Sequence, residues 1–354
     1  MELKELRTKI DAIDSELLKL LNNRMELALR TTKLKGEVTD PEREDAVIDN
    51  VKKRSHGLLK PEFAEKMYRE IMAESKRLQE KGLRLAGFQG EHGAYGDMAV
   101  RTYENSLVPV PCVEFGEVFE GVRNGQLDIG IVPVENSLEG AVTQVNDLLV
   151  ETDLKIIGEV NVPIHHCLLA PPEADYHDIK VVYSHPQALA QCRGFLARNK
   201  LEPRPYYDTA GAAMMLANEK PKAAAAIASR LCAEMYGLEI LKENIEDHES
   251  NSTRFLVLSR ECVKGKAKGD KCSIVFQTAH KAGALFSVLK HFSDAGVNLT
   301  RIESRPIRND PGKYAFLLDF KGSEDDRKVA DMLGNVKKET VMFKLLGCYK
   351  EAKG

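Results

Sequence analysis

The sequence predicts a multidomain protein with an all-helical N-terminal unit, a two-lobed α/β unit and a ferredoxin-like α+β unit. Three observations predict it. Residues 1–82 hold only two prolines and three glycines, residues 83–262 alternate apolar runs with helix-like segments, and the chain beyond them follows the order βαββαβ. We therefore expect domains at 1–82, 83–262 and 271–354, with a charged linker at 263–270.

The composition is that of a globular protein without a dominant charge. Hydrophobic residues make up 43% and charged residues 30% of the chain, and the formal net charge is −3. This balance argues against a nucleic-acid-binding surface. The sequence contains no run of about 18 apolar residues, so no membrane span is expected. The seven cysteines are scattered without metal-ligand spacing, and the N-terminus lacks an apolar signal core. We expect reduced thiols, no metal and a cytoplasmic location.

Residues 1–82 predict one long helix followed by two shorter ones, because glycine and proline interrupt the segment at only a few positions. Apolar residues follow steps of three and four along the long helix, which is typical of a packed-helix stripe. The stripe consists of Leu3, Leu6, Ile10, Ile13, Leu17, Leu20, Leu27 and Leu34. A helix of about 30 residues is about 45 Å long, and two short helices cannot cover it. We expect dimerisation through the stripe.

Arg24 occupies the stripe position between Leu20 and Leu27. A guanidinium in an apolar seam costs several kcal/mol unless an anion meets it. Lys35 lies three turns further on nearly the same face, whereas Arg7 points about a quarter-turn away. Arg7 could therefore reach the same pocket only from another subunit or another helix. The alternative for each of these cationic side chains is that it lies on a charged, solvent-exposed face of its helix.

The ordered set of polar residues in 1–82 resembles the all-helical chorismate mutase family, with Arg, Arg, Lys, D-x-x-R-E and a final S-x-x-x-Q. The resemblance implies that chorismate is rearranged to prephenate without a cofactor or metal. It also implies an intertwined dimer that donates Arg7 in trans, with Lys35 and Gln79 as catalytic groups facing the ether oxygen. The implied chorismate-binding residues are Arg7, Arg24, Lys35, Arg43, Glu44, Ser75 and Gln79.

In residues 83–262, apolar runs such as LDIGIVPV and AAAAIAS predict buried, substantially parallel strands. Polar clusters follow several of them, and open α/β sheets bind ligands outside the carboxyl ends of their strands. Simpler explanations remain for single residues. Asn136 and Ser137 could cap the next helix, and His185 could be a turn residue. Thr253 could be a β-former entering a strand.

The segment HESNSTRFLVLS (248–259) places Thr253 and Arg254 where a polar loop enters a strand expected at 255–258. It offers no nucleophile–base pair. The glycine-rich loop GFQGEHGAYGDMA lacks G-x-G-x-x-G and G-K-[ST], so a nucleotide site is not expected. Its backbone amides could instead receive an anion.

Four motifs of this part resemble prephenate dehydratase: G-x-x-G-x-x-G-x-Y, P-V-E-N-S, S-H-P-Q-A-L and S-T-R-F. The resemblance implies a fold like that of type 2 periplasmic binding proteins, with Thr253 as the catalytic residue. Gly96 stands where many members have a hydroxyl residue. The implied substrate-binding residues are Glu135, Asn136, Ser137, Ser184, His185, Gln187, Thr253, Arg254 and Phe255.

The segments KAGALF (281–286) and IESRP (302–306) lie on the predicted βαββαβ pattern. They could be a helix cap and the end of an edge strand. Together they resemble the regulatory ACT domain of dehydratases, which implies phenylalanine as an effector and feedback inhibition. The residues implied to bind it are Gly283, Ala284, Leu285, Glu303, Ser304 and Arg305.

These resemblances predict the bifunctional chorismate mutase–prephenate dehydratase family, acting on chorismate and prephenate as a homodimer or higher oligomer. One alternative is arogenate dehydratase activity, because QGEHGAY, HHCLLA and DTAGAA are similar to that branch too. The other is a non-catalytic amino-acid sensor. Retention of Thr253 and of the whole mutase cation set argues against a sensor, which needs neither.

Overall fold

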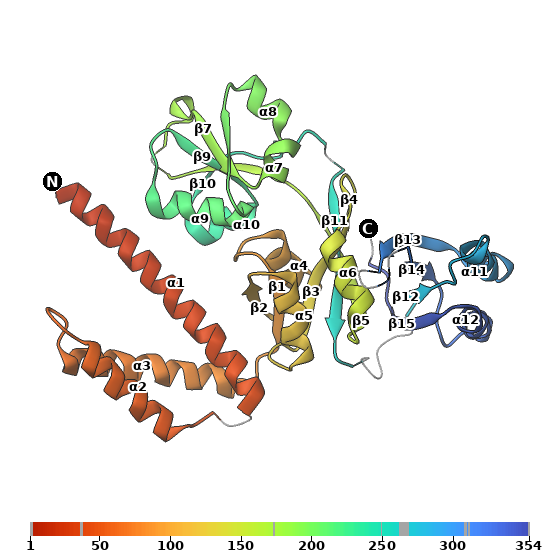
Figure 1. The fold of residues 1–354 in the computed structure, drawn as a ribbon. Coiled ribbons are helices and arrows are strands. Elements are labelled where there is room, and N and C mark those ends of the chain that lie inside the picture. The colour runs from red at the N-terminus through yellow and green to blue at the C-terminus, as the bar shows by residue number, and fades with distance from the viewer. Residues whose placement is uncertain are drawn as a thin grey trace. The chain divides into compact units, whose positions relative to one another are not determined.

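The computed structural model describes residues 3–35, 38–172, 174–248, 250–261, 269–307, 310 and 312–352 (Figure 1). The chain forms two compact units, Met1–Leu85 with Gly125–Leu127, and Ala86–Asn124 with Asp128–Gly354. Most of the expected linker, together with Cys262 and Gly36, lies outside the described residues.

The first unit contains the three helices that the sequence predicts: α1 (Leu3–Lys35), α2 (Pro41–Arg54) and α3 (Pro61–Glu80). Proline stands at the first turn of both shorter helices, where its missing N–H costs nothing. Asp40 caps α2 by accepting a hydrogen bond from the Arg43 backbone N–H at 3.1 Å. These signals explain why α2 and α3 begin where they do.

The apolar stripe of α1 lies exposed in the single chain. All eight of its side chains are exposed, from 41% for Leu6 to 65% for Leu3. Within α1, Leu29 is the hydrophobic side chain that is buried, at 7% exposure. Exposed leucines and isoleucines at this density mark a surface that binds another apolar surface.

Six strands form the first sheet of the second unit, in the order β2-β1-β3-β11-β5 with β4 paired to β3. The strands are β1 (Leu85–Gln89), β2 (Val108–Cys112), β3 (Ile129–Asn136), β4 (Gly140–Ala141), β5 (Lys155–Pro163) and β11 (Ser252–Ser259). The associated helices are α4 (Tyr95–Tyr103), α5 (Phe115–Arg123) and α6 (Thr143–Glu151). Phe88, Ile131 and Val257 lie in its hydrophobic core.

Five strands form the second sheet, in the order β10-β6-β9-β7-β8. They are β6 (Cys167–Ala170), β7 (Val181–Ser184), β8 (Glu202–Pro205), β9 (Ala224–Ala228) and β10 (Glu239–Lys242). The associated helices are η1 (Tyr176–Asp178), α7 (Pro186–Gln191), α8 (Arg193–Arg198), α9 (Thr209–Glu219) and α10 (Arg230–Tyr236). The chain crosses from β5 to β6 and returns from β10 to β11, so the two sheets form two lobes joined by two connections (Figure 1).

The prediction of substantially parallel strands is wrong for part of both sheets. Strand β1 pairs parallel with β3, and β7 pairs parallel with β8 and β9. Strand β11 is antiparallel to β3 and to β5, and β6 is antiparallel to β9 and to β10. Since β11 returns from the second lobe to the middle of the first sheet, it is as buried as a parallel strand. It therefore shows the same continuous apolar run.

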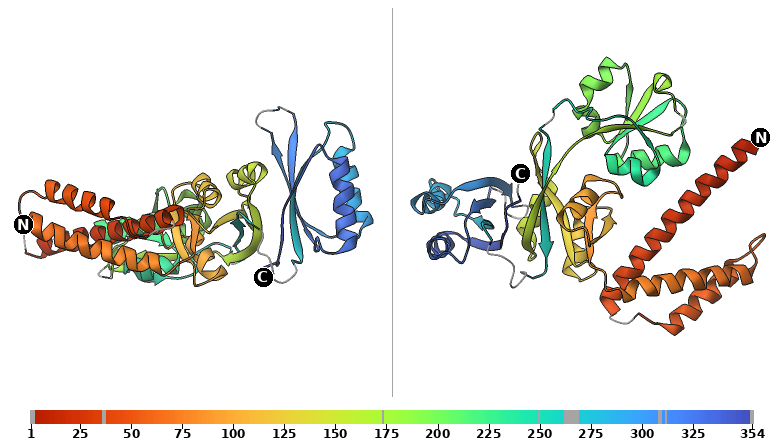
Figure 2. Two further views of the ribbon diagram at one scale, coloured as in Figure 1. Left: turned by 90° about the horizontal axis from the view of Figure 1, so that it is seen from below. Right: turned by 180° about the vertical axis from the view of Figure 1, so that it is seen from behind.

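The predicted βαββαβ order is confirmed in the C-terminal part. Its elements are β12 (Lys271–Gln277), α11 (Ala284–Asp294), β13 (Leu299–Pro306), β14 (Tyr314–Lys321), α12 (Arg327–Glu339) and β15 (Met342–Tyr349). The antiparallel sheet has the order β13-β14-β12-β15, and both helices lie on one face of it (Figure 2). Strand β15 approaches β5 so closely that a Cβ on Gly347 would lie 2.1 Å from the Ile156 carbonyl oxygen.

The expectation of reduced thiols is wrong for one pair of cysteines. Cys272 of β12 and Cys348 of β15 face each other in the ladder and form a disulfide, with their Cα atoms 4.2 Å apart. They are 76 residues apart in sequence, so only the strand pairing brings them together. Cys167, Cys192 and Cys232 are buried thiols outside this disulfide, and Cys112 is buried as well.

Candidate active sites

Six of the side chains predicted to bind chorismate line one cavity of about 280 Å³ among α1, α2 and α3. They are Arg24 and Lys35 from α1, Arg43 and Glu44 from α2, and Ser75 and Gln79 from α3. With Lys76 and Asp40, the lining carries four cationic and two anionic side chains. This excess of positive charge suits a ligand with two carboxylates.

Contacts between α1 and α3 hold the polar side chains of the cavity. Arg24 Nη1 donates to Ser75 Oγ at 2.8 Å, and Gln79 Nε2 donates to the Ala28 carbonyl oxygen at 2.6 Å. At the other end, Lys35 Nζ lies 2.9 Å from Asp40 Oδ2. This contact lowers the pKa of Asp40. The loop before α2 is thereby joined to the end of α1.

Arg7 does not line this cavity. It lies 17 residues before Arg24 on the same helix, about 26 Å away along the axis. A second cavity of about 450 Å³ shares Arg24 and Arg43 with the first and extends along α2 and α3 past Arg54 and Tyr68. Among the described residues of α1, Arg24 is the one that lines this second cavity.

Thr253 lies inside β11 and not in the loop before it, because the strand begins at Ser252. Asn136 of β3 stands opposite Thr253, and its Nδ2 donates to Thr253 Oγ1 at 3.0 Å. Asn136 Oδ1 accepts the backbone N–H groups of Leu138 and Glu139 at 3.0 and 3.1 Å. Asn136 thus closes a turn instead of capping a helix.

These contacts fix the direction of the hydrogen bond to Thr253. Because Asn136 Oδ1 faces two donors, its Nδ2 must face Thr253, whose oxygen acts as the acceptor. Among the residues that the structure describes, the Thr253 hydroxyl donates to no acceptor.

Asn251 is a residue that the sequence reasoning missed. Its Oδ1 accepts from Asn136 Nδ2 at 2.7 Å, so its Nδ2 points elsewhere. That Nδ2 is buried and has no hydrogen-bond partner in the described part of the chain. Asn251 lies two residues before Thr253 in the same polar segment. Its position close to Thr253 was the signal available in the sequence.

The predicted residues of the second lobe lie at the end of β7. Ser184 Oγ donates to the Ile227 carbonyl oxygen at 2.7 Å, and His185 caps α7. Gln187 Nε2 donates to a carboxylate oxygen of Glu139, which follows β3 in the first lobe. Gln191 Nε2 donates to the other oxygen at 2.8 Å. Glu139 therefore joins the P-V-E-N-S and S-H-P-Q-A-L segments.

Gln191 continues this chain of contacts to the glycine-rich loop. Its Oε1 lies 2.7 Å from His166 Nε2, and His166 Nδ1 lies 3.0 Å from the Tyr95 hydroxyl. Burial lowers the pKa of His166, so its ring is neutral at pH 7. Next to Tyr95, a Cβ on Gly96 would lie 2.8 Å from the Phe88 ring. Packing against Phe88 explains the glycine that departs from the family pattern.

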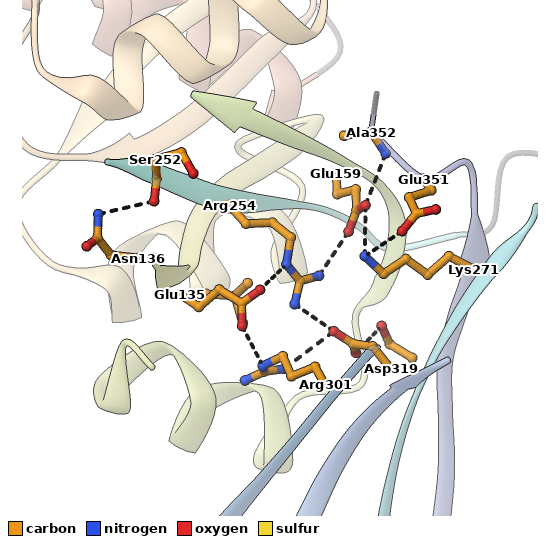
Figure 3. Close-up of polar contacts among 12 residues, drawn as sticks. Glu135, Asn136, Glu159, Ser252, Arg254, Lys271, Arg301, Asp319, Glu351 and Ala352 are labelled. Atoms are coloured by element: carbon orange, nitrogen blue, oxygen red, sulfur yellow. Dashed lines mark hydrogen bonds and ion pairs between the residues drawn. The ribbon is translucent and has the colours of Figure 1, made fainter. Parts of the chain in front are cut away.

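Glu135 and Arg254 lie on the face of the sheet opposite to Asn136 and Thr253, since neighbouring side chains in a strand alternate. Arg254 donates from its three nitrogens to three carboxylates (Figure 3). These belong to Glu135, Glu159 and Asp319, at 2.7, 2.9 and 2.7 Å. Phe255, the third residue of T-R-F, is buried in the hydrophobic core.

The cluster around Arg254 includes three residues that the sequence reasoning missed: Glu159, Lys271 and Asp319. Lys271 Nζ lies 3.0 Å from Glu159 Oε1, and both side chains are almost fully buried. A charged residue within an otherwise apolar strand predicts an ion pair, because burying an unpaired charge is costly. That signal was present in the sequence, but it does not identify the partner.

A third cavity, of about 320 Å³, lies in the C-terminal part. The GAL turn lines it with Gly283, Ala284 and Leu285, as do Tyr314 and Phe316 of β14. Gly283 has φ +79° at the start of α11, a conformation that favours glycine.

The IESRP residues do not line this cavity. Ser304 stands opposite Phe316, one of its lining residues. Arg305 Nε donates to Asp147 Oδ1 of α6 at 2.6 Å, and Arg305 Nη1 lies 4.0 Å from Glu303. Glu303 and Arg305 thus point to the other face of the sheet.

The described residues contain no helix long and apolar enough to cross a membrane. In the same residues, no group of three or more histidine, cysteine, aspartate or glutamate side chains could hold a metal ion.

Comparison with known proteins supplies two matching family models, Chorismate mutase type II over residues 6–80 and Prephenate dehydratase over residues 86–263. A bifunctional chorismate mutase/prephenate dehydratase of Pseudomonas aeruginosa is 36% identical, covering 99% of this chain and 98% of that protein. A solved prephenate dehydratase from Arthrobacter aurescens, in complex with L-Phe, has a TM-score of 0.69 and 34% identity, covering 75% of this chain and 89% of that one. A structure described as GqqA, a quorum quenching acylase, has a TM-score of 0.70 and 35% identity, covering 75% of this chain and 97% of that one.

Proposed function

The chain belongs to the bifunctional chorismate mutase/prephenate dehydratase family, and from this premise we propose how its residues carry the two reactions. It rearranges chorismate to prephenate and converts prephenate to phenylpyruvate. The assignment of residues rests on one observation: the residues of each motif set lie together in the structure. Six mutase residues line one cavity, and Asn136 contacts Thr253.

The helical unit performs a pericyclic rearrangement, which needs no nucleophile. Arg24 and Arg43 bind the two carboxylates of chorismate and hold its compact conformer. Lys35 and Gln79 face the ether oxygen, on which negative charge grows in the transition state. A millionfold acceleration requires about 8 kcal/mol. Positioning together with two hydrogen-bond donors is a reasonable source of that energy.

Arg7 completes this site from a second copy of the chain. Its distance from Arg24 along α1 excludes it from its own cavity. The exposed stripe of α1 supplies an apolar surface for a dimer, and the cavity along α2 and α3 is open to a second α1. A homodimer or a higher oligomer with intertwined helices accounts for all three observations.

In the dehydratase, Thr253 gives or relays a proton to the leaving ring hydroxyl of prephenate. Asn136 keeps the Thr253 oxygen as an acceptor, so the hydroxyl proton points away from it. Carbon dioxide and water leave together and the ring becomes aromatic, which supplies the driving force. Ser137, His185 and Gln187 belong to the same site, in a fold like that of type 2 periplasmic binding proteins.

Purified protein supplied with chorismate tests both activities. We expect phenylpyruvate to accumulate without an added cofactor. Absence of prephenate formation would rule out the mutase assignment. Prephenate that accumulates without phenylpyruvate would rule out the dehydratase assignment.

Arogenate is the competing substrate of the second reaction, on the strength of the motifs shared with that branch. A mutase on the same chain makes prephenate locally, which favours prephenate. Parallel turnover measurements with both substrates decide between them.

An acylase needs a nucleophile activated by a base, and the Thr253 hydroxyl instead accepts a hydrogen bond from an amide.

The C-terminal part is an ACT domain that binds phenylalanine and inhibits the dehydratase. The cavity around Gly283, Ala284 and Leu285 supports this proposal, since amides at the start of α11 can receive a carboxylate. Glu303, Ser304 and Arg305 belong to the strand that carries the second motif. We keep the domains at 1–82, 83–262 and 271–354. The cytoplasmic location expected from the sequence stays a prediction.

A further inference from the structure

The two residues Thr253 and Arg254 follow one another on β11, and their side chains lie on opposite faces of the sheet. The same holds on β3, where Asn136 stands opposite Thr253 and Glu135 stands opposite Arg254. The Asn136–Thr253 pair and the Glu135–Arg254 pair therefore share two short backbone segments. A displacement of one pair displaces the other.

The Arg254 side chain is held by protein groups alone. It is 8% exposed, and each of its three nitrogens donates to a carboxylate. The Glu159 and Asp319 side chains are 1% and 2% exposed. Burial alone would lower the pKa of Arg254, but Asp319, Tyr349 and Glu135 together outweigh burial and raise it. The guanidinium is a fixed cation already matched by carboxylates.

The third of these carboxylates comes from the C-terminal domain. Asp319 lies on β14, where its Oδ1 accepts from Ser273 Oγ at 2.7 Å. Arg301 of β13 lies 3.7 Å from Asp319 and 3.5 Å from Glu135 (Figure 3). Strand β13 also carries the IESRP motif. The strand with the predicted regulatory motif is thus ion-paired to Glu135 and Asp319, two of the carboxylates that hold Arg254.

We propose that Arg254 is a positioning residue for Thr253 that does not touch the substrate, and that Asp319 makes this positioning dependent on the C-terminal domain. The proposal rests on the proposed function, because it takes Thr253 as the residue that acts on prephenate. It assigns Arg254 a role different from the substrate contact that the family resemblance implies. The ion pair is the physical connection through which phenylalanine binding would reach Thr253.

Arg254→Lys tests the positioning role, since lysine keeps the charge but cannot contact three carboxylates at once. We expect kcat for prephenate to fall at least about tenfold, as a small misplacement of a catalytic group does. KM should stay within about twofold, because no substrate contact is lost. Chorismate mutase activity of the same preparation serves as an internal control. A tenfold rise in KM with kcat retained would make Arg254 a substrate-binding residue and overturn the proposal.

Asp319→Asn tests the dependence on the C-terminal domain. We expect the half-inhibiting concentration of phenylalanine to rise about tenfold, a usual size for a coupling between two sites. Uninhibited kcat should fall less than in Arg254→Lys, because two carboxylates remain. Lys344→Met is the matched control. Lys344 of β15 donates to the Val150 carbonyl oxygen across the same interface, away from Arg254, and its loss should change neither quantity.

Asp319→Asn with kcat and phenylalanine response both within twofold of the wild type overturns the second part of the proposal. Equal effects in Lys344→Met overturn it too, since any loosening of the interface would then suffice. If Asp319→Asn does not fold, Ser273→Ala replaces it. That change removes one hydrogen bond from Asp319 without altering a charge, and it should shift the phenylalanine response in the same direction.

Failure of the proposed function is recognised separately. If Thr253→Ala retains dehydratase turnover, the site itself is misassigned. If wild-type turnover does not respond to phenylalanine, the regulatory assignment fails, and Arg254→Lys alone decides the positioning role. If both assignments hold and the Arg254 and Asp319 variants behave like the wild type, only this inference is wrong.

Discussion

Asn136 donates to the Thr253 hydroxyl, and its own oxygen accepts two backbone N–H groups. The turn after β3 therefore fixes an amide, and the amide fixes the direction in which a hydroxyl can donate. This arrangement suits an elimination that needs a placed proton and no activated nucleophile. At the scale of single residues, the chemistry that we propose for Thr253 rests on the direction of this hydrogen bond.

Thr253→Ala should lower dehydratase kcat by at least about a hundredfold, the usual contribution of a positioned proton donor. Mutase activity should stay unchanged, because the variant alters only the second unit. Thr253→Ser keeps the hydroxyl and is the matched control, which should retain most of the turnover. Steady-state rates with prephenate and with chorismate measure both effects. Equal losses in the alanine and serine variants would contradict a role for the hydroxyl.

The buried carboxylate of Asp319 predicts a pH dependence of stability. Burial alone would raise its pKa, but the charges of Arg254 and Arg301 together with hydrogen bonds from Ser273 and Arg254 outweigh burial, so the pKa lies below the ordinary value. The folded chain then binds fewer protons than the unfolded chain as the pH falls below about 4. The stabilisation by Asp319 is full above that pH and is lost on further acidification.

Urea unfolding of the wild type and Asp319→Asn at several pH values measures this effect. The variant should be less stable by about 3 kcal/mol at pH 7 and at pH 5, because the buried charges of Arg254 and Arg301 are then only partly compensated by the remaining carboxylates. The difference should shrink below about pH 4, as the aspartate of the wild type takes up a proton. A difference that instead shrinks between pH 7 and pH 5 would show that another group dominates.

Motif residues such as Thr253 and Asn136 could be proposed from the sequence because their neighbours form short, specific patterns. Glu159 and Asp319 could not be assigned, although both are charges within apolar strands. Their partners lie on strands distant in sequence, and only the sheet order and register bring them within 3 Å of Arg254. The local pattern specifies that a charge needs a partner, and tertiary structure selects the partner.

At the scale of elements, helix α1 both lines a cavity and presents an exposed apolar stripe. Its C-terminal half supplies Arg24 and Lys35 to its own cavity, while Arg7 lies too far along the axis to join them. The stripe that the sequence showed as apolar is exposed along the whole length of α1. In the dimer that we propose, a second copy of the chain would cover this stripe and supply Arg7.

Mixing two inactive variants tests this arrangement. Arg7→Ala and Arg24→Ala should each abolish mutase activity, because each removes a contact to a chorismate carboxylate. Co-expression should restore about a quarter of wild-type activity, since half of the random dimers are hybrids with one intact site of two. Mutase rates of co-expressed and separately expressed preparations give the comparison. No recovery in verified hybrid dimers would place Arg7 in the same chain as Arg24.

The hydrophobic pattern of the sequence predicts only part of strand β11. The apolar run predicts a strand at 255–258, but the strand begins at Ser252 and includes the polar pair Thr253–Arg254. Both polar side chains are buried because each has partners on the neighbouring strands. Polarity alone would assign them to a loop, so the hydrophobic pattern underestimates a strand that carries a site.

At the scale of the whole molecule, the order of helical, α/β and α+β parts could be predicted. Each part has its own spacing of apolar residues and its own pattern of glycine and proline. The direction of the strands could not, since burial on both faces gives the same apolar run in either direction. The contact between β15 and β5 was equally invisible in the sequence. That contact makes the C-terminal sheet part of the surroundings of Arg254.

Inhibition of the dehydratase by phenylalanine should depend on the C-terminal cavity. Substituting a residue that lines the cavity tests this dependence. Phe286 lines the cavity and is 70% exposed, so Phe286→Ala removes an apolar wall at little cost to folding. We expect the half-inhibiting concentration of phenylalanine to rise about tenfold, the effect of losing one good apolar contact. Uninhibited dehydratase turnover should not change. Val341→Ala is the matched control, because Val341 is 71% exposed and does not line the cavity. Inhibition curves that coincide for Phe286→Ala and the wild type would place the phenylalanine site elsewhere.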